Sequence, residues 1–301
     1  MNLLSLHEEC CKYLLVEKGN TEATIETYKA IFRGFCVWLE NEGVPVDISS
    51  VGDHEILKRF MYDLADKKLH RNTIKLHMTS LKTFCKYLLR ENELERNPFE
   101  RFDIPRKVKS RAKPLNDQVR DKLVSLTICR ALSSNELRDI QAVVMVLLGL
   151  TCGLRKKGMR SMMWENTDLV NCETRVIDKG EKEHTYVLSP SAVKWLKVLK
   201  SARGVDKGYV LLSPKSNTPI SETSLHDEFR RYVELVGLGG MGITLHRLRH
   251  TFGTNLLEGT GDLRLVQEAL CHEDIGSTVC YTEVAKKKLR ENIKRVFSNA
   301  K

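Results

Sequence analysis

The chain has 301 residues, enough for two domains with separate cores. Its 42% hydrophobic and 29% charged content is that of an ordinary globular protein. The longest apolar run, residues 142–154, fits a buried helix and is too short to span a membrane. The first residues lack a basic segment and the nine cysteines form no CxxC pair, so we expect a cytoplasmic protein with reduced cysteines and no signal peptide.

The net charge of +10 is distributed unevenly along the chain. Residues 1–105 hold 15 basic and 17 acidic residues, whereas residues 106–301 hold 34 and 22. A basic excess attracts polyanions, of which nucleic acid is the commonest. A merely solvated basic surface would have the same composition, so charge alone leaves both interpretations open.

The first hundred residues are predicted to be helical. Apolar residues recur at helical spacing after the capping residues 20–21. They are Ile25, Tyr28, Phe32, Phe35 and Leu39. A third helix is expected to start near Asp53, and a fourth to cover residues 72–90.

The fourth predicted helix has one basic face. No acidic residue occurs between Lys67 and Arg90. The basic residues on this face are Arg71, Lys75, Lys82, Lys86 and Arg90. A helix with one apolar and one basic face can pack inward while it lies against DNA. A solvated charged face is the alternative, but such faces normally mix signs, which favours DNA contact.

Residues 98–114 contain three prolines around a basic run. Proline ends helices, and like charges repel and extend the chain. We therefore predict a helical domain over residues 1–105, an extended basic linker over 106–114 that follows a phosphate backbone, and a second domain over 115–301. The basic residues of the run are Arg106, Lys107, Lys109, Arg111 and Lys113.

The second domain has a mixed pattern. Helices are expected at residues 116–126, 136–150, 191–201, 223–236, 246–258 and 263–270. Between Thr174 and Leu188, β-branched residues on both sides of the turn KGEK predict a β-hairpin. The fold class is thus mainly α with a small β-sheet in the second domain.

The stretch LHRLRHTFGTN, residues 245–255, concentrates basic and titratable side chains. His246 and Arg249 are three residues apart and share a helix face. A guanidinium fork and an imidazole suit a phosphate. His246 and His250 have the spacing of a zinc pair, but Arg247 stands where a metalloprotease needs glutamate. We therefore expect no metal here.

Other candidate site residues lie on both sides of this stretch. Arg155 follows a buried apolar helix in LTCGLRKKGM, and Lys179 lies in the hairpin turn. His272 and Tyr281 follow in ALCHEDIGSTVCYTEV. Each residue alone has an ordinary structural interpretation, but the set in this order favours a functional site.

These motifs together resemble those of the tyrosine recombinases, the phage-integrase and Xer-like group. The resemblance is carried by GLR, DKGEK, HRLRHTFGTNLL and LCHEDIGSTVCYTEVA, in that order. Upstream, TYKAIFRGFCVWL and TIKLHMTSLKTFCKYLL resemble the SAM-like core-binding domain of the same family. The resemblance covers nearly the whole chain. It implies a helical SAM-like core-binding domain followed by an α+β catalytic domain.

The resemblance also implies roles for individual residues. Arg155 would be the phosphate-binding arginine and Lys179 the hairpin lysine. His246 and Arg249 would form the His-x-x-Arg pair. His272 would be the second histidine and Tyr281 the nucleophile. Three positions depart from the family pattern. Gly158 replaces an acid, Cys271 replaces a glycine, and His184 or a neighbour replaces a basic residue of the second hairpin strand.

This set can perform phosphodiester chemistry. The Tyr281 hydroxyl would attack phosphorus, and the two arginines would stabilise the charge on the equatorial oxygens. Lys179 is the candidate acid for the 5′ oxygen, His246 could act as a base or hydrogen-bond donor, and His272 would orient the phosphate. The division of proton transfer between Lys179 and His246 stays open. Fixed cations and a covalent 3′-phosphotyrosine need no metal, cofactor or ATP.

The resemblance also implies partners. They are double-stranded DNA with specific recombination sites and further copies of the chain, a dimer per site and a tetramer across two sites. Accessory DNA-bending proteins and a nucleoid-associated location would accompany them. The task would be integration and excision of a mobile element or Xer-like resolution. Two alternatives remain: a type IB topoisomerase, and a non-enzymatic DNA-binding protein on a degenerate recombinase scaffold.

Overall fold

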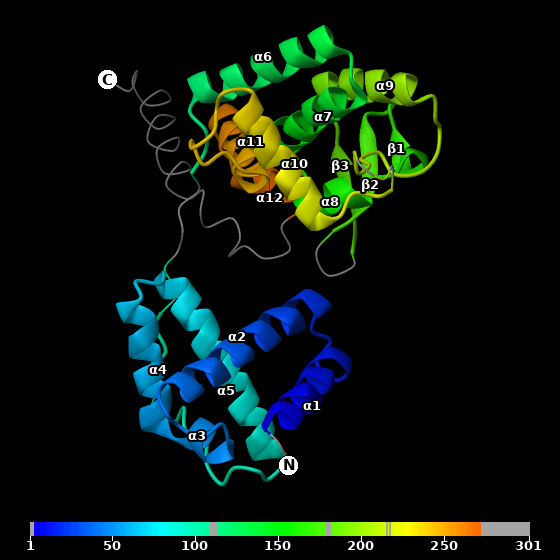
Figure 1. Cartoon of the computed structure of the whole chain (residues 1–301). Helices are drawn as coiled ribbons and strands as arrows, with labels where there is room; N and C mark the ends of the chain where they lie inside the picture. Colours follow the sequence, from blue (N-terminus) through cyan, green and yellow to red (C-terminus); the bar gives the residue numbers. More distant parts are fainter. Residues whose placement is uncertain are drawn as a thin grey trace, which may run out of the picture. The chain divides into compact units, whose positions relative to one another are not determined.

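The computed structural model describes residues 3–100, 102–106, 108, 113–178, 182–214, 216 and 218–271. The chain divides into two compact units, residues 1–109 and residues 110–301. The first unit is helical and the second adds a small sheet, so the predicted fold class is confirmed (Figure 1). No helix in the described part of the chain is both long and apolar enough to cross a membrane.

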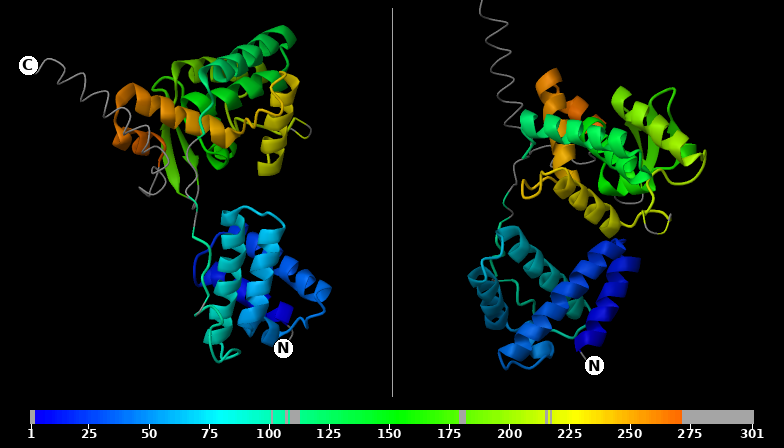
Figure 2. Two further views of the ribbon diagram at one scale, coloured as in Figure 1. Left: turned by 90° about the vertical axis from the view of Figure 1, so that its left-hand side faces the viewer. Right: turned by 45° about the horizontal axis from the view of Figure 1, so that its top comes forward.

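Among its described residues, the N-terminal unit has helices and no strand. The helices are α1 (Leu3–Val16), α2 (Glu22–Asn41), α3 (Ile48–Gly52), α4 (His54–Asp66) and α5 (Arg71–Arg90). Helices α1, α2 and α5 pack against one another, and α4 packs against α5 (Figure 2). Their apolar stripes meet in one core, which includes Phe32, Phe35, Met78 and Leu88.

The predicted helix starts of this unit are confirmed with one correction. Thr21 is the N-cap of α2, as its position after Gly19 indicated. The helix expected near Asp53 is α4, which begins at His54 with Asp53 as its N-cap; the correction is that it is the fourth helix, because the short α3 precedes it. The Asp53 carboxylate accepts the backbone N–H groups of Glu55 and Ile56, at 2.7 and 3.4 Å. An N-cap residue lies immediately before the first helical residue, so its signal in the sequence marks the start of the helix to within one residue.

The C-terminal unit contains seven α-helices in the part that the structure describes. They are α6 (Asp117–Ser134), α7 (Leu137–Thr151), α8 (Lys156–Ser161), α9 (Pro190–Arg203), α10 (Glu222–Leu235), α11 (Leu245–Thr260) and α12 (Leu263–Ala269). Helix α7 is buried along nearly its whole length, and α6, α9, α10 and α11 pack around it. This apolar helix therefore forms the centre of the unit (Figure 1).

The sheet of this unit has three antiparallel strands. They are β1 (Thr167–Asp168), β2 (Glu173–Ile177) and β3 (Glu183–Val187), in that spatial order, after the 3₁₀ turn η1 (Trp164–Asn166). The predicted hairpin is confirmed as β2 and β3, and Thr174 pairs with Tyr186. Both of these side chains, and that of Val176, are buried. Strand β1 was not predicted, because two residues show no alternation.

Helix α6 is longer than predicted, since it ends at Ser134 and not at residue 126. Leu123, Thr127 and Ala131 recur every fourth residue and are buried, and α6 packs against α7. A polar threonine in the middle hides this stripe in the sequence. The buried Thr127 hydroxyl donates to the backbone oxygen of Leu123, which satisfies it within the helix.

Candidate active site

Arg155 is placed by the sharp end of helix α7. Gly153 adopts a φ of +68°, and a Cβ there would lie 2.5 Å from Cδ1 of Phe252. Only glycine satisfies both the backbone conformation and this close approach. The N–H of Leu154 donates back to the oxygen of Leu148 at 3.1 Å. Arg155 then occupies the N-cap position of α8 without a side-chain capping bond, directly after the buried helix as the sequence indicated.

Arg249 is placed by the burial pattern of helix α11. Thr244 caps this helix and accepts the N–H of Arg247 at 3.1 Å. Leu245, Leu248 and Arg249 are buried, and the arginine is only 3% exposed. His246 remains accessible one turn earlier. The helix therefore aims one guanidinium into the interior and keeps one imidazole near the surface.

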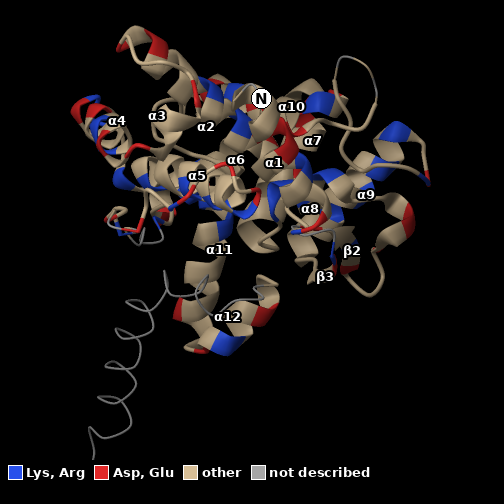
Figure 3. Ribbon diagram, turned by 90° about the horizontal axis from the view of Figure 1, so that it is seen from below, with Lys and Arg blue, Asp and Glu red and all other residues tan. Residues whose placement is uncertain are grey.

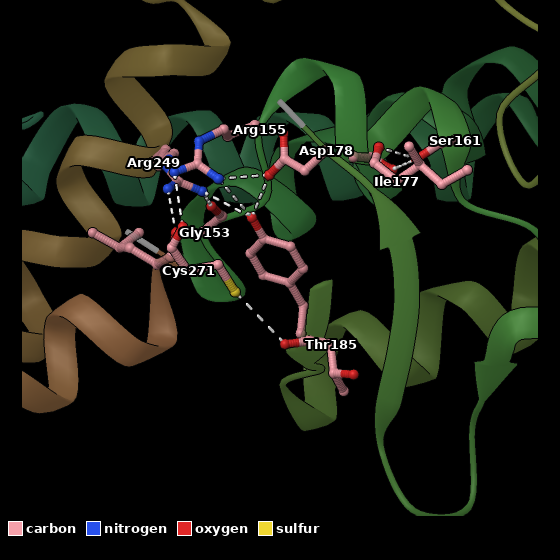
Figure 4. A network of polar contacts seen from close by, with 11 residues as sticks. Gly153, Arg155, Ser161, Ile177, Asp178, Thr185, Arg249 and Cys271 are labelled. Carbon is pink, nitrogen blue, oxygen red and sulfur yellow. Dashed lines mark hydrogen bonds and ion pairs between the residues drawn. The ribbon is translucent and has the colours of Figure 1, made fainter. Parts of the chain in front are cut away.

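The two arginines meet at a buried hydroxyl and carboxylate. Asp178 follows β2 and is fully buried, and its Oδ2 accepts Nη1 of Arg155 at 2.6 Å. The Tyr186 hydroxyl donates to the same oxygen at 2.7 Å. It accepts Nη1 of Arg155 at 3.4 Å and Nη1 of Arg249 at 3.3 Å. Segments far apart in the chain thus build one connected polar cluster (Figure 4).

Backbone carbonyls fix the other edges of the guanidiniums. Arg249 donates to the oxygens of Gly153 and Leu270, and Arg155 donates to the oxygen of Cys271 at 3.1 Å. Cys271 has a φ of +47°. A non-glycine residue is strained in this left-handed region, by about 1 kcal/mol. A glycine, which the family resemblance places at this position, would relieve that strain.

Burial and the nearby positive charges favour a neutral imidazole beside the two arginines. Partial burial lowers the pKa of His246, and the positive charges of Arg249 and Lys156 lower it further. Burial also lowers the pKa of His250, to about 4. Burial raises the pKa of Tyr186, which keeps its hydroxyl protonated as the donor to Asp178. At neutral pH, His246 can therefore accept a proton or donate one hydrogen bond.

Three of the six predicted catalytic residues are described, and the structure brings Arg155 and Arg249 together with His246 nearby. Lys179, His272 and Tyr281 lie outside the described residues. Sequence reasoning missed Asp178 and Tyr186. Alternation along the hairpin could have placed Tyr186 inward, but nothing in the sequence pairs it with Asp178.

The first arginine of the HRLR motif has another role. Arg247 donates to the backbone oxygens of Lys113 and Met241, at 3.0 and 2.7 Å, and reaches those of Pro114 and Gly242 at 3.4 Å. One turn later, the Thr251 hydroxyl accepts the N–H of Leu115 at 2.9 Å. This face of α11 therefore holds the segment that enters the C-terminal unit. The part of the chain that the structure describes contains no cluster of side chains suited to a metal ion.

The basic side chains on the predicted face of α5 differ in whether they pair with a carboxylate. Arg71, Lys75, Lys82 and Lys86 have no carboxylate at ion-pair distance among the described residues, in contrast to the mixed charges of α4 (Figure 3). Arg90 does have partners: it pairs with Glu17 and Glu91 and lies 4.3 Å from the ring of Tyr13.

The predicted linker residues are described only in part. Arg106 is exposed, whereas Lys107, Lys109 and Arg111 lie outside the described residues. Asn72, at the start of α5, exchanges two hydrogen bonds with the backbone of Val108, at 2.8 and 3.0 Å. The beginning of the basic run therefore lies beside the beginning of α5 within the N-terminal unit.

Two family profiles match the chain. The phage integrase family matches residues 121–288, and the N-terminal SAM-like domain of phage integrases matches residues 8–92. The first match alone spans more than half of the chain. The chain therefore belongs to the phage integrase family and is a site-specific tyrosine recombinase, a class of enzyme that cleaves and rejoins DNA strands.

Similar proteins align along nearly the full length. Tyrosine recombinase XerD of Pseudomonas aeruginosa is 27% identical over 92% of this chain and 92% of its own. Tyrosine recombinase XerC of Pediococcus pentosaceus is 27% identical over 99% and 98%. Tyrosine recombinase XerC of Shewanella amazonensis is 30% identical over 72% and 73%.

Solved structures share the fold. XerH bound to a palindromic difH substrate, a post-cleavage complex, has a TM-score of 0.73 at 19% identity and covers 97% of this chain and 84% of its own. A lambda integrase dimer bound to a COC′ core site has a TM-score of 0.69 at 19% identity, over 92% and 76%. A lambda integrase tetramer bound to a Holliday junction scores 0.69 at 18% identity, over 92% and 76%.

Proposed function

We propose that this recombinase cleaves specific DNA sites by attack of the Tyr281 hydroxyl on a phosphodiester, which leaves a covalent 3′-phosphotyrosine and a free 5′ hydroxyl. Arg155 and Arg249 bind the phosphate and stabilise the negative charge of the transition state. Lys179 protonates the leaving oxygen, His246 exchanges a proton or hydrogen bond, and His272 orients the phosphate. The observation that carries the proposal is the convergence of Arg155 and Arg249 on the Tyr186 hydroxyl, which is itself bonded to the buried Asp178 carboxylate.

The same geometry supports a reaction that needs no metal. Two guanidiniums present several N–H donors in fixed directions, and a phosphate accepts such bidentate contacts. The donors of Arg155 and Arg249 that no carbonyl, hydroxyl or carboxylate occupies are available to phosphate oxygens. Rejoining reverses the attack, so the energy of the broken bond is kept in the phosphotyrosine.

The DNA and subunit partners form the second part of the proposal. Related structures are of a recombinase on a difH substrate and of lambda integrase as a DNA-bound dimer and tetramer. By analogy, this chain binds double-stranded DNA as a dimer on each site and a tetramer across two. The basic face of α5 at Arg71, Lys75, Lys82 and Lys86, and Arg106 of the linker, would contact phosphates. The 106–114 segment is the proposed linker between residues 1–105 and 115–301, and the cytoplasmic nucleoid is the proposed location.

The test is a search for covalent adducts. The protein is mixed in EDTA with DNA that flanks its own gene, denatured in SDS, and examined for DNA attached to the chain. We expect an adduct from the wild type and from Tyr62→Phe, whose ring lies on the surface of α4, but none from Tyr281→Phe. Strand exchange between two DNAs then separates a recombinase from a topoisomerase. Tight DNA binding without any adduct would favour a non-catalytic DNA-binding protein and would overturn the proposal.

A further inference from the structure

The support of Arg155 comes from an unexpected element. The family resemblance places an acid three residues after this arginine, but the chain has Gly158 there. Gly158 is buried in α8, and a Cβ at this position would lie 3.1 Å from Cγ2 of Val176. The carboxylate that holds Arg155 is instead Asp178, at the end of β2. We propose that Asp178 is a positioning residue that replaces the missing acid of α8 and, through Tyr186, aligns both phosphate-binding arginines.

The burial of Asp178 shows how strongly it depends on these partners. Its side chain has no exposed surface, and a buried carboxylate is costly unless it is paired and hydrogen-bonded. Arg155 supplies the positive charge and Tyr186 supplies a hydroxyl hydrogen, both to the same oxygen. Because the Tyr186 hydroxyl also faces Nη1 of Arg249 at 3.3 Å, one carboxylate orients one arginine directly and the other through a hydroxyl.

The same residue also connects the arginine to the hairpin. The N–H of Asp178 donates to the oxygen of Lys182 at 2.9 Å, which pairs the two strands where the KGEK turn begins. At the other end of α8, the Ser161 hydroxyl donates to the oxygen of Ile177 at 2.7 Å. Figure 4 shows the contact of Ser161 with Ile177 beside Asp178 at the end of β2. Helix α8 is therefore bonded to this strand end at both of its own ends, and the candidate acid Lys179 is the next residue in the chain.

This proposal rests on the proposed function and predicts a specific defect. Asp178→Asn keeps the shape of the side chain but removes the charge that fixes Arg155. The rate of adduct formation in a single turnover, on DNA captured by the wild type, should fall about tenfold to a hundredfold, as expected for a displaced catalytic group. The dissociation constant for that DNA should stay near the wild-type value, because the phosphate contacts proposed for α5 and Arg106 do not involve Asp178. Asp139→Asn is the matched control, since Asp139 is also buried and paired, with Arg130 and Ser134.

A second variant distinguishes positioning from simple stability. In the Asp178→Asn background, Gly158→Glu returns a carboxylate to the family position on α8, whereas Gly158→Gln adds the same bulk against Val176 without charge. We expect the glutamate to restore a substantial part of the rate and the glutamine to restore none. Equal rates from these two variants would contradict the proposed replacement.

The tyrosine gives an independent measurement that does not depend on α8 tolerating a larger residue. Tyr186→Phe removes only the hydroxyl, and its rate loss should be smaller than that of Asp178→Asn because Arg155 keeps its ion pair. The double variant with Asp178→Asn and Tyr186→Phe should lose a smaller factor in the rate of adduct formation than the product of the two single-variant factors. Both residues act through one network. Independent, multiplying losses would show that the two residues do not work as a unit.

Binding of orthovanadate to the protein alone separates this inference from the proposed function. Vanadate mimics a phosphate and needs the arginines but no DNA. Weaker vanadate binding in Asp178→Asn than in Asp139→Asn supports positioning, even if the wild type forms no DNA adduct and the proposed function fails. Wild-type adducts accompanied by identical vanadate binding and cleavage in the two variants would overturn the role of Asp178 and leave the proposed function intact.

Discussion

The two units of the chain bury different chemistry. The N-terminal interior is apolar and aromatic. The rings of His7, Phe32 and Phe84 stack or meet edge to face there, with ring centroids 3.9–5.0 Å apart. The interior beside α11 in the C-terminal unit instead contains Arg249, Asp178 and the Tyr186 hydroxyl. Apolar burial stabilises a fold, whereas a buried ionic cluster adds little net stability and chiefly fixes geometry.

This contrast indicates which parts of the chain tolerate substitution and which do not. An aromatic core accepts many substitutions that keep volume and shape. A polar cluster accepts few, because each group left without a partner carries its full desolvation cost. Substitutions in the aromatic core of the first unit should therefore change stability, and substitutions in the polar cluster of the second unit should also change catalysis. The following predictions test this contrast, from the largest expected effect to the smallest.

Phe84→Ala should have the largest effect on stability. Phe84 is 1% exposed and meets the rings of His7 and Phe32. Removing a buried phenylalanine costs about 4 kcal/mol of unfolding free energy. Denaturant unfolding of the full chain measures it, with Leu76→Ala on the exposed face of the same helix as control. A loss no greater than that of the control would contradict the packing described for this core.

Arg249→Lys should have the largest effect on catalysis. Lysine keeps the charge but cannot bond the oxygens of Gly153 and Leu270 and the Tyr186 hydroxyl in one plane. Loss of one fixed donor raises a barrier by about 3 kcal/mol, so adduct formation should slow by at least a hundredfold. Arg230→Lys, on the surface of α10, should keep the wild-type rate. If Arg249→Lys reacts as fast as that control, the planar fork is not needed.

Acid should destabilise the N-terminal unit through His7. Burial, together with the positive charges of Lys29 and Arg33, lowers the pKa of His7 from its ordinary value of 6.5 to about 4. Since the unfolded state binds the proton first, stability is fully present above pH 6.5 and falls as the pH approaches 4. The loss is at most about 3 kcal/mol for a shift of this size.

The control for this prediction is His7→Phe, which keeps an aromatic ring against Phe32 but cannot titrate. The difference in unfolding free energy between the wild type and this variant should change across that pH range and stay constant above it. A constant difference at every pH would show that His7 does not couple acid to unfolding.

The sequence predicted the apolar framework better than the polar cluster, for a physical reason. Regular recurrence of Phe32, Phe35 and Leu39, or of Ile74, Met78 and Leu81, is a local property that one helix displays by itself. The resemblance and the spacing of the HRLR motif likewise located Arg155 and Arg249. The Asp178–Tyr186 pair has no local signature, because its meaning arises only when β2, β3, α8 and α11 come together.

The two arginines of the HRLR motif show the same limit of prediction from sequence within one turn of a helix. Only the three-residue spacing from His246 distinguishes Arg249 from Arg247 in HRLRH, and this spacing does not show that Arg249 is buried in the candidate active site or that Arg247 bonds backbone oxygens. Because the two arginines are two positions apart on a helix, their side chains point in different directions. Which of the two faces the site depends on α7 and on the segment at residues 113–115. The sequence assigned Arg249 through its spacing from His246 and the family motif, and it used Arg247 only as an argument against a metalloprotease site.

Arg247→Ala should therefore have the smallest effect, and an effect of a different kind. It removes contacts with the oxygens of Lys113 and Met241 at a partly exposed position, which is worth about 1 kcal/mol. The amide of Leu115, which donates to Thr251 on the same face, should exchange its hydrogen faster, while adduct formation keeps its rate. Arg264→Ala, an exposed arginine of α12, should leave that amide unchanged. A rate loss comparable to that of Arg249→Lys would mean that the two arginines share one task, and that the division between a backbone anchor and a phosphate-binding group within α11 is wrong.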